Sequence, residues 1–285
     1  MRFLSDDAVA HLREITEIPD LSATRYELVR ELGRGGMGIV YEVRDRELER
    51  TVAMKVVETE WSDHRGAEEA RIIAALEHPG IVPVHDSGTL PDGRLYYTMK
   101  LVRGARLDGW TQQDHGITER LRLFARICEP VAFAHANGVV HRDLKPENVM
   151  VGEFGAVLVM DWGIVGVGTP GYMAPEQARG ESASARSDVY ALGAVLAFLI
   201  RGGAIPRPLA AIIGRAMAGD PAARYADAQA LADDVLRYLD QEPVTAYRES
   251  VVERAGRWVT RHRALLTLMA AYIVMRVIVF FWMRL

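Results

Sequence analysis

The glycine-rich stretch GRGGMG, residues 33 to 38, constrains the fold more than any other feature, because strand-like IVYEV follows it directly. In a dinucleotide-binding fold such glycines would open a helix, and the G-x-x-x-x-G-K-[ST] loop of the other major nucleotide fold is absent from the sequence. Glycines between two antiparallel strands let backbone amides approach phosphate oxygens with no side chain between them. The motif therefore predicts a flap over nucleotide phosphates, with an ordinary hairpin turn as the alternative.

Strand-like and helix-like segments fall into two blocks along the chain. The strand-like segments YELVREL, GIVYEVRD and TVAMKVVE precede a helix predicted at 67–77, and IVPVHDSG and LYYTMKLV follow it. From Thr118 onward helical spacing of apolar residues dominates, at 118–136, 187–201, 207–218 and 227–239. The pattern predicts an α+β chain with a small β-rich lobe and a larger helical lobe. A short helix is also predicted at 5–18.

Lys55 lies on the predicted strand VAMKVV, 17 residues after Gly38. Strand alternation places Ala53 and Lys55 on one face, so this lysine can reach phosphate oxygens beneath the glycine flap. Such a cation needs a carboxylate to hold it, and the following helix offers Glu69 as the preferred candidate and Glu68 as the competitor.

The stretch HRDLKPENVMV, residues 141 to 151, is the most specific in the chain. It stands third in a series of six motifs, GRGGMG, VAMK, HRDLKPEN, DWG, GTPGYMAPE and SDVYALG, whose order resembles that of the eukaryotic-type protein kinases. More specifically, the chain resembles the bacterial, membrane-anchored (Hanks-type) serine/threonine kinases, over about residues 26–240. The resemblance implies a bilobal protein-kinase fold and transfer of the ATP γ-phosphate to Ser or Thr hydroxyls of proteins, including the chain itself.

The resemblance also implies roles for the polar residues of these motifs. Asp143 would accept the proton of the attacking hydroxyl, and Lys145 would neutralise charge on the transferring phosphoryl group. Asn148 and Asp161 would hold Mg2+, or Mn2+ in its place, because hard cations take oxygen ligands. Thr169 would bridge the catalytic aspartate and lysine. The implied catalytic residues are Asp143, Lys145, Lys55, Glu69 and Thr169.

An ATP pocket follows from the same resemblance. Met99 would guard the back of the adenine pocket, and residues 100–102 would bind adenine through the backbone. Lys100 stands where the family often has an acidic residue, which a backbone contact tolerates. The implied nucleotide-binding residues are Leu32, Gly33, Arg34, Gly35, Gly36, Met37, Gly38, Val40, Ala53, Lys55, Met99, Lys100 and Val102.

Three further residues receive structural roles by resemblance. Glu176 in APE would pair with Arg224 in DPAARY, and this buried link would hold the substrate-side loop. Asp188 in SDVYALG would anchor the backbone of the catalytic loop from below.

Two segments are shorter than the family pattern. Only residues 164–167 separate DWG from GTPGYMAPE, and this gap contains no Ser, Thr or Tyr, so activation by phosphorylation there is not expected. RGGAIPRPLAAI joins two helices almost directly, where the family inserts a loop and a substrate-docking helix. Both shortenings affect the platform for a protein substrate. An ATP-binding pseudokinase that serves as a membrane-tethered scaffold, and a small-molecule kinase, are therefore the alternative functions.

The stretch 264–283 is mostly apolar and has a single charged residue, Arg276. As a helix of about 30 Å it would match the hydrocarbon core of a bilayer. The arginines before it (254, 257, 261 and 263) predict a single-pass protein of the inner membrane, with the main domain in the cytoplasm and the lipid bilayer as a partner. A buried or partner-binding helix is the alternative.

The predicted organisation is an N-terminal extension at 1–25, an N-lobe with hinge at 26–102, a C-lobe at 103–240, a basic linker at 241–263 and a transmembrane helix at 264–283. A net charge of −4 argues against nucleic acid as a partner. Cys128, the single cysteine, has apolar neighbours at helical spacing and is predicted to be a core residue rather than a reactive thiol. A homodimer is left open.

Overall fold

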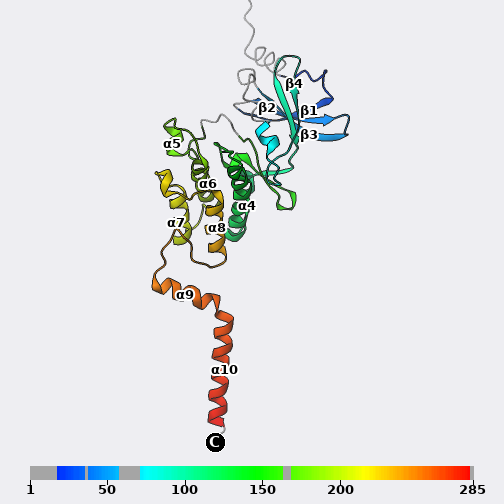
Figure 1. Ribbon diagram of the computed structural model, residues 1–285. Coiled ribbons are helices and arrows are strands. Elements are labelled where there is room, and N and C mark those ends of the chain that lie inside the picture. Colours follow the sequence, from blue (N-terminus) through cyan, green and yellow to red (C-terminus); the bar gives the residue numbers. More distant parts are fainter. Residues whose placement is uncertain (1–17, 36–37, 58–70, 163–167, 283–285) are drawn as a thin grey trace, which may run out of the picture.

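The computed structural model describes residues 18–35, 38–57, 71–162 and 168–282, which form two lobes followed by a C-terminal pair of helices (Figure 1). The strands are β1 (Tyr26–Gly35), β2 (Gly38–Asp45), β3 (Arg50–Val57), β4 (Val84–Thr89), β5 (Leu95–Lys100), β6 (Gly104–Arg106), β7 (Val149–Gly152) and β8 (Val157–Val159). The α-helices are α3 (Leu107–Trp110), α4 (Ile117–Ala136), α5 (Pro175–Ala178), α6 (Ala185–Leu199), α7 (Arg207–Ala216), α8 (Ala228–Leu239), α9 (Val251–Arg261) and α10 (Arg263–Trp282).

The first lobe is an antiparallel sheet with the strand order β1-β2-β3-β5-β4. One face of β3 is apolar, and its residues Val52, Met54 and Val56 are buried in a cluster with β1, β2 and β5. The alternate residues Ala53 and Lys55 line a cavity on the other side. The predicted alternation is therefore present, and it directs the lysine toward the space between the lobes.

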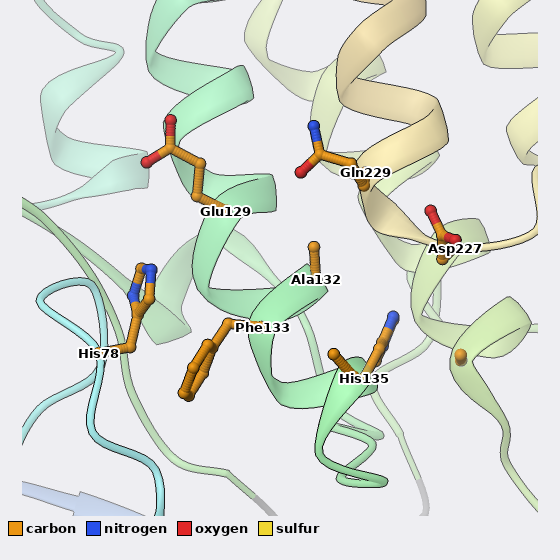
Figure 2. A pocket seen from close by; sticks show the side chains of 9 residues that line it. His78, Glu129, Ala132, Phe133, His135, Asp227 and Gln229 are labelled. Carbon is orange, nitrogen blue, oxygen red and sulfur yellow. The ribbon is translucent and has the colours of Figure 1, made fainter.

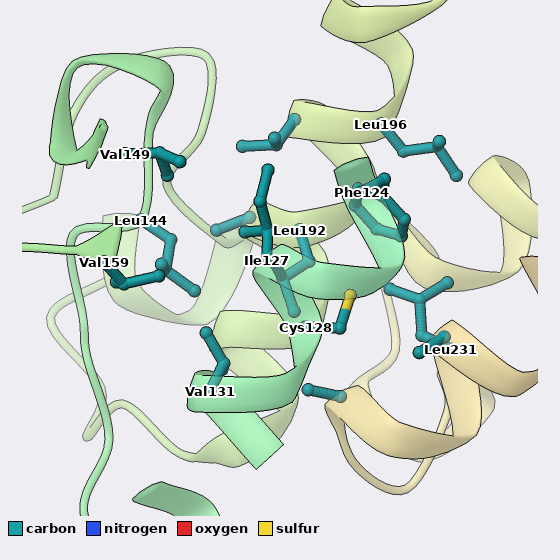
Figure 3. Close-up of a cluster of buried hydrophobic side chains, with 14 of the residues drawn as sticks. Phe124, Ile127, Cys128, Val131, Leu144, Val149, Val159, Leu192, Leu196 and Leu231 are labelled. Atoms are coloured by element: carbon teal, nitrogen blue, oxygen red, sulfur yellow. The ribbon is translucent and has the colours of Figure 1, made fainter. Parts of the chain in front are cut away.

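The second lobe is built on α4, α6, α7 and α8, which pack around one large apolar cluster. Figure 3 shows its centre, where Cys128 of α4 lies among Ile127, Leu192 and Leu231. The Cys128 side chain is completely buried, and burial raises the pKa of its thiol well above the usual value. The burial confirms that Cys128 is a core residue. The raised pKa disfavours the thiolate, which is the reactive form of cysteine.

A small sheet, β6-β7-β8, joins the helical lobe to the cavity between the lobes. The turn that precedes β7 carries Asn148, and Asp161 follows β8 by two residues. The short antiparallel pairing of β7 with β8 therefore brings two residues that are 13 positions apart in the sequence to the same edge.

Most predicted elements are confirmed within about two residues. The four helices of the second lobe occur as α4, α6, α7 and α8, and only residues 200–206 separate α6 from α7. Of the helix predicted at 67–77, residues 71–75 are helical, and the part with Glu68 and Glu69 lies outside the described residues. The helix predicted at 5–18 lies outside them except for its last residue, which is not helical.

The C-terminal prediction requires a correction. A helix does form where the apolar stretch was noted, since α10 runs from Arg263 to Trp282. Within the part of the chain that the structure describes, however, no helix is both long enough and apolar enough to cross a membrane. The α10 helix includes Arg263 and Arg276, and a charge at the bilayer centre costs about 2.5–3.5 kcal/mol on insertion scales. The predicted lipid contact and inner-membrane location rest on sequence pattern alone.

Candidate active site

A cavity of about 650 Å3 lies between the five-stranded sheet and the helical lobe. Every predicted nucleotide-binding residue that the structure describes lines it, as do the predicted catalytic and metal-binding residues other than Glu69. Gly36, Met37 and Glu69 lie outside the described residues. The predicted residues in the lining are Leu32, Gly33, Arg34, Gly35, Gly38, Val40, Ala53, Lys55, Met99, Lys100, Val102, Asp143, Lys145, Asn148, Asp161 and Thr169.

The glycine-rich segment forms the upper wall of this cavity, at the end of the β1–β2 hairpin. Gly35 pairs with Gly38 across the hairpin, and Gly38 in turn lies opposite Val57 of β3. The φ angle of Gly38 is +146°, and a Cβ atom at this position would collide with the carbonyl oxygen of Val56. Only glycine fits there, because it has no Cβ and tolerates positive φ. The close approach of the flap to β3 is therefore a direct consequence of the sequence.

Lys55 extends from β3 into the cavity, with only 7% of its side chain exposed. Its Nζ lies 3.5 Å from Oδ1 of Asp161, which belongs to the segment after β8. Asp161 has a φ angle of +54°, an uncommon backbone conformation for a non-glycine residue that directs its side chain to this end of the cavity. A buried cation and a carboxylate that is 47% exposed thus meet where phosphate groups would lie.

Asp143, Lys145 and Thr169 form a compact triad at the mouth of the cavity. Nζ of Lys145 lies 2.8 Å from Oδ2 of Asp143 and donates a hydrogen bond of 2.8 Å to Oγ1 of Thr169. The Thr169 hydroxyl in turn donates to Oδ1 of Asp143 at 2.8 Å. Each group therefore orients the other two. The bridge by Thr169 joins residues that are 26 positions apart in the sequence.

The backbone before Asp143 is held from below by Asp188 of α6. Its carboxylate accepts hydrogen bonds from the backbone N–H of His141 at 2.7 Å and of Arg142 at 2.9 Å. A third bond, from Nε2 of His135, measures 2.9 Å. Arg142 has a φ of +72°, and such a strained residue persists only where the surroundings over-determine it. Asp188 supplies these constraints and so fixes the direction in which Asp143 points.

His141 links the same loop to the segment that carries Asp161. Burial lowers the pKa of this histidine, so its ring is neutral near pH 7. Nε2 donates to the carbonyl oxygen of Met160 at 2.9 Å, and Nδ1 accepts from the backbone N–H of Asp143 at 3.4 Å. The ring lies 4.8 Å from that of Trp162, which is buried and donates to the Val159 carbonyl oxygen.

The oxygen ligands in the cavity fit a magnesium ion that is held jointly with a nucleotide. Asn148 donates through Nδ2 to the backbone carbonyl of Asp143 at 2.8 Å, which leaves its amide oxygen pointing away from that bond. Asp161 supplies a carboxylate at the same edge. Mg2+ commonly binds one or two protein oxygens together with substrate phosphates. Among the described residues, no cluster of three or more metal-binding side chains forms a site complete in itself.

Glu176 and Arg224 form the buried pair that the resemblance implies, beneath the segment that follows Thr169. Nη1 and Nη2 of Arg224 lie 2.7 and 2.8 Å from the two carboxylate oxygens, and Ser187 donates to the same carboxylate at 2.8 Å. The hydrogen bonds from Arg224 are the main reason that the pKa of Glu176 falls to about 2. This bidentate geometry ties α5 to the loop before α8.

A second cavity, of about 710 Å3, lies along α4 (Figure 2). Glu129, Phe133 and His135 of α4 face His78, Asp227 and Gln229 across it. None of the predicted site residues lines this cavity. Its link with the active site is His135, which bonds Asp188.

Several residues of the main cavity were not among the predicted set. Val82, Gly104, Arg106, Glu147, Met150 and Met160 also line it. Two of them could have been predicted from their position in the sequence: Met150 is two residues beyond Asn148 on a strand, and Met160 directly precedes Asp161. Arg106 and Val82 had none, since their place depends on how β6 and the segment before β4 fold onto the sheet.

The cavity lies between a β-rich lobe and a helical lobe, and one end of it carries the charged groups of Lys55 and Asp161. This arrangement is typical of phosphotransferases that bind their nucleotide between two lobes. Residues 26–210 match the protein kinase domain model. The chain belongs to the protein kinase domain family.

Curated relatives and a solved structure agree with this assignment. The chain is 31% identical to the serine/threonine-protein kinase PknD of Chlamydia felis over an alignment that covers 85% of this chain and 34% of the relative. It is 37% identical to PknB of Mycolicibacterium smegmatis, with coverages of 83% and 43%. The PknI kinase domain of Mycobacterium tuberculosis superimposes with a TM-score of 0.63 at 28% identity, over 76% of this chain and 96% of that domain. The chain thus spans well under half the length of these two curated relatives.

Proposed function

We propose that the chain is an ATP-dependent serine/threonine protein kinase that phosphorylates proteins, including copies of itself. The observation that carries this proposal is the mutual hydrogen bonding of Asp143, Lys145 and Thr169 at 2.8 Å. A carboxylate that is held by a lysine and a threonine at the mouth of a nucleotide-sized cavity can orient a hydroxyl and accept its proton. The names of the relatives, serine/threonine-protein kinases, support the choice of acceptor.

The mechanism divides the work between the two ends of the cavity. Lys55, paired with Asp161, binds the phosphates of ATP, and the glycine flap covers them with backbone amides. Asn148 and Asp161 would hold Mg2+, which would neutralise phosphate charge there. Asp143 aligns the acceptor hydroxyl with the γ-phosphorus and takes its proton, and Lys145 offsets the charge on the transferring group. Thr169 keeps those two side chains at the correct spacing.

A pseudokinase scaffold is less consistent with these contacts. A protein that only binds the nucleotide needs the flap and Lys55, but it does not need Asp143 held by two partners. Arg142, which precedes Asp143, is further held by Asp188 in a strained backbone conformation. Strain of this kind, of order 1–3 kcal/mol per residue, is typical of active sites rather than of inert surfaces. We therefore favour catalysis.

The short segment between Asp161 and Thr169 bears on substrate selection. On the side where a protein substrate would bind, the buried pair of Glu176 and Arg224 holds α5 in place. We infer that the enzyme recognises a small part of its protein substrate, and that partner proteins supply the remaining surface. A small-molecule kinase, the other alternative function, would have no use for this support.

The test is phosphate transfer by the full chain with labelled ATP and Mg2+, with the chain itself and a generic basic protein as acceptors. Asp143→Asn should lower transfer about 100- to 10,000-fold, the usual contribution of a general base. Asp114→Asn, an exposed aspartate outside the cavity lining, is the matched control and should leave transfer unchanged. If Asp143→Asn retains full transfer, the proposed role is wrong. If wild type transfers nothing while ATP raises its melting temperature, the pseudokinase reading replaces ours.

A further inference from the structure

The segment between α8 and α9 is bound to the helical lobe by one buried carboxylate. Residues 244–247, here called the strap, follow α8 and precede α9. Val244 is buried in the main apolar cluster, and Ala246 and Tyr247 pack against it. Thr245, in contrast, is exposed. Thr245 is thus an exposed residue in a strap whose neighbouring residues hold it against the lobe.

Asp234 of α8 accepts three hydrogen bonds from the strap, in addition to the packing of Val244 and the hydrogen bond from Arg215. Asp234 is 1% exposed. It accepts hydrogen bonds from the backbone N–H of Thr245 at 2.6 Å, from the Thr245 hydroxyl at 2.7 Å and from the N–H of Ala246 at 3.0 Å. The hydroxyl of Tyr225 donates a fourth bond at 2.8 Å. Burial favours the neutral acid, but these four donors reverse that effect and lower the pKa of Asp234, so the group is charged near neutral pH.

The partners of Asp234 connect the strap with the buried pair beneath the substrate side. Tyr225, which donates to Asp234, directly follows Arg224, and Arg224 binds Glu176 at 2.7 Å. Arg215 of α7 lies over the Tyr225 ring at 4.4 Å and donates to Oγ1 of Thr245 at 2.9 Å. A change at the Thr245 hydroxyl therefore reaches, through two contacts, the residues that hold α5.

We propose that Thr245 is a phosphorylation site of this kinase and that its modification releases the strap. The proposal rests on the serine/threonine kinase activity proposed above. Thr245 is an exposed residue with a guanidinium, that of Arg215, positioned at its Oγ1. The gap at 164–167, where the family places its regulatory hydroxyl residues, contains none, so control by phosphorylation requires another position.

The reaction occurs between two copies of the chain. In Figure 1 the connection from α8 to α9 leaves the helical lobe at the end that points away from the β-rich lobe, whereas the cavity lies between the lobes. Oγ1 of Thr245 in one copy attacks the γ-phosphorus of ATP bound to the other. The new O–P bond forms as the bond to the bridging oxygen breaks, ADP leaves with that electron pair, and the hydroxyl proton passes to Asp143 of the acting copy.

The product cannot keep the present contacts. A phosphate on Oγ1 would bring about −1.5 to −2 charges next to the Asp234 carboxylate, whose Oδ2 lies 2.7 Å from this oxygen. The Thr245 hydroxyl also loses its proton and can no longer donate. Repulsion between like charges at this distance separates the strap from Asp234, and the Arg215 guanidinium is then available to bind the phosphate. The unmodified and modified forms therefore correspond to a bound and a released strap.

The experiment incubates the full chain with Mg2+ and ATP and maps phosphate by mass spectrometry in wild type, Thr245→Val, Thr245→Ser and Ser250→Ala. Ser250→Ala is the matched control. It removes a hydroxyl from the same α8–α9 connection, and that hydroxyl bonds Glu253 rather than Asp234. Trypsin cleavage after the exposed Arg248 reports release of the strap. We expect mass spectrometry to find phosphate at position 245 in wild type and in Thr245→Ser, and none at this position in Thr245→Val. Trypsin should cleave after Arg248 about tenfold faster in phosphorylated than in unphosphorylated wild type, because the charge-assisted hydrogen bonds to Asp234 are lost.

Each other outcome overturns a defined part. Phosphate that appears elsewhere on the chain but not at Thr245 would refute the assignment and leave the kinase activity intact. No transfer to any acceptor would refute the proposed function and this inference together. Phosphate at Thr245 with unchanged trypsin cleavage after Arg248 would refute release of the strap. The control Ser250→Ala keeps Thr245, so ATP treatment should speed its cleavage to the same extent as in wild type.

Discussion

Replacement of Glu176 by glutamine should destabilise the helical lobe strongly. Glu176 and Arg224 are 4% and 3% exposed, and the Arg224 side chain is completely buried. Glutamine has nearly the same shape, so the change removes charge and leaves the volume unchanged. The guanidinium then keeps its bonds to the carbonyl oxygens of Ala218 and Arg186, which are neutral and do not offset its charge.

The expected loss follows from this burial. Removing one partner of a buried ion pair costs about 3–5 kcal/mol, because the remaining charge is left uncompensated in a medium of low polarity. A free energy of unfolding of about 5–15 kcal/mol is typical of whole domains, so roughly a fifth or more of the total is at stake. Replacing both residues by leucine should recover part of the loss, because no buried charge then remains.

The same pair makes stability depend on acid. Glu176 has a pKa lowered from its ordinary value of 4.5 to about 2. A depressed carboxyl pKa contributes stability that is fully present above the unfolded-state value and is lost as the pH falls from about 4.5 toward 2. The difference in pKa corresponds to about 3 kcal/mol over this window, at 1.36 kcal/mol per unit. In Glu176→Gln this part of the acid dependence should be absent.

Denaturant unfolding at pH 7 and at stepped lower pH values measures both effects. The matched control is Glu181→Gln, which breaks an exposed pair with Arg179, both side chains being more than half exposed. This variant should change stability by less than about 1 kcal/mol. A loss below about 1 kcal/mol in Glu176→Gln, or an acid dependence identical to that of wild type, would show that the buried charge is not the source of the stability assigned to it.

Three further experiments test the site, the glycine flap and the core. Thr169→Val removes the hydroxyl that joins Asp143 and Lys145, and we expect it to lower kcat while changing the KM for ATP little, whereas Thr169→Ser should keep most of the activity; equal kinetics in the two variants would refute the proposed role of this bridge. Gly38→Ala should destabilise the flap by more than 1 kcal/mol, since its Cβ meets the Val56 carbonyl at positive φ, and thermal unfolding measures this. Cys128 should resist iodoacetamide until the chain unfolds, because burial raises its pKa; rapid labelling of the native protein would contradict its core position.

Local sequence determined the elements that depend on near neighbours. Strand alternation at Ala53 and Lys55 and the helical periodicity of α4, α6, α7 and α8 follow from residues within a few positions of one another. The need for glycine at position 38, in contrast, depends on the Val56 carbonyl oxygen of the neighbouring strand. The motif resemblance added the members of the cavity, because each motif carries its residues at short spacing. These predictions could be made from sequence because backbone geometry repeats over short distances.

The C-terminal helix marks the boundary of this approach. The apolar pattern correctly predicted a helix at α10, but no described helix is long and apolar enough to cross a membrane. Composition over a window gives the tendency to form a helix and its mean hydropathy. What surrounds that helix is a property of the assembled molecule.

Distances between remote residues required the folded chain. The sequence by itself determined that Lys55, Asp143, Asn148 and Asp161 stand in motifs whose order is that of a protein kinase. Only the tertiary structure decided that Lys55 meets Asp161 at 3.5 Å, that Asp188 collects three donors, and that Asp234 binds the strap at Thr245. The physical reason is that hydrogen bonds and ion pairs act over about 3–4 Å, whereas their partners are separated by many residues whose relative placement is set by packing of the whole core.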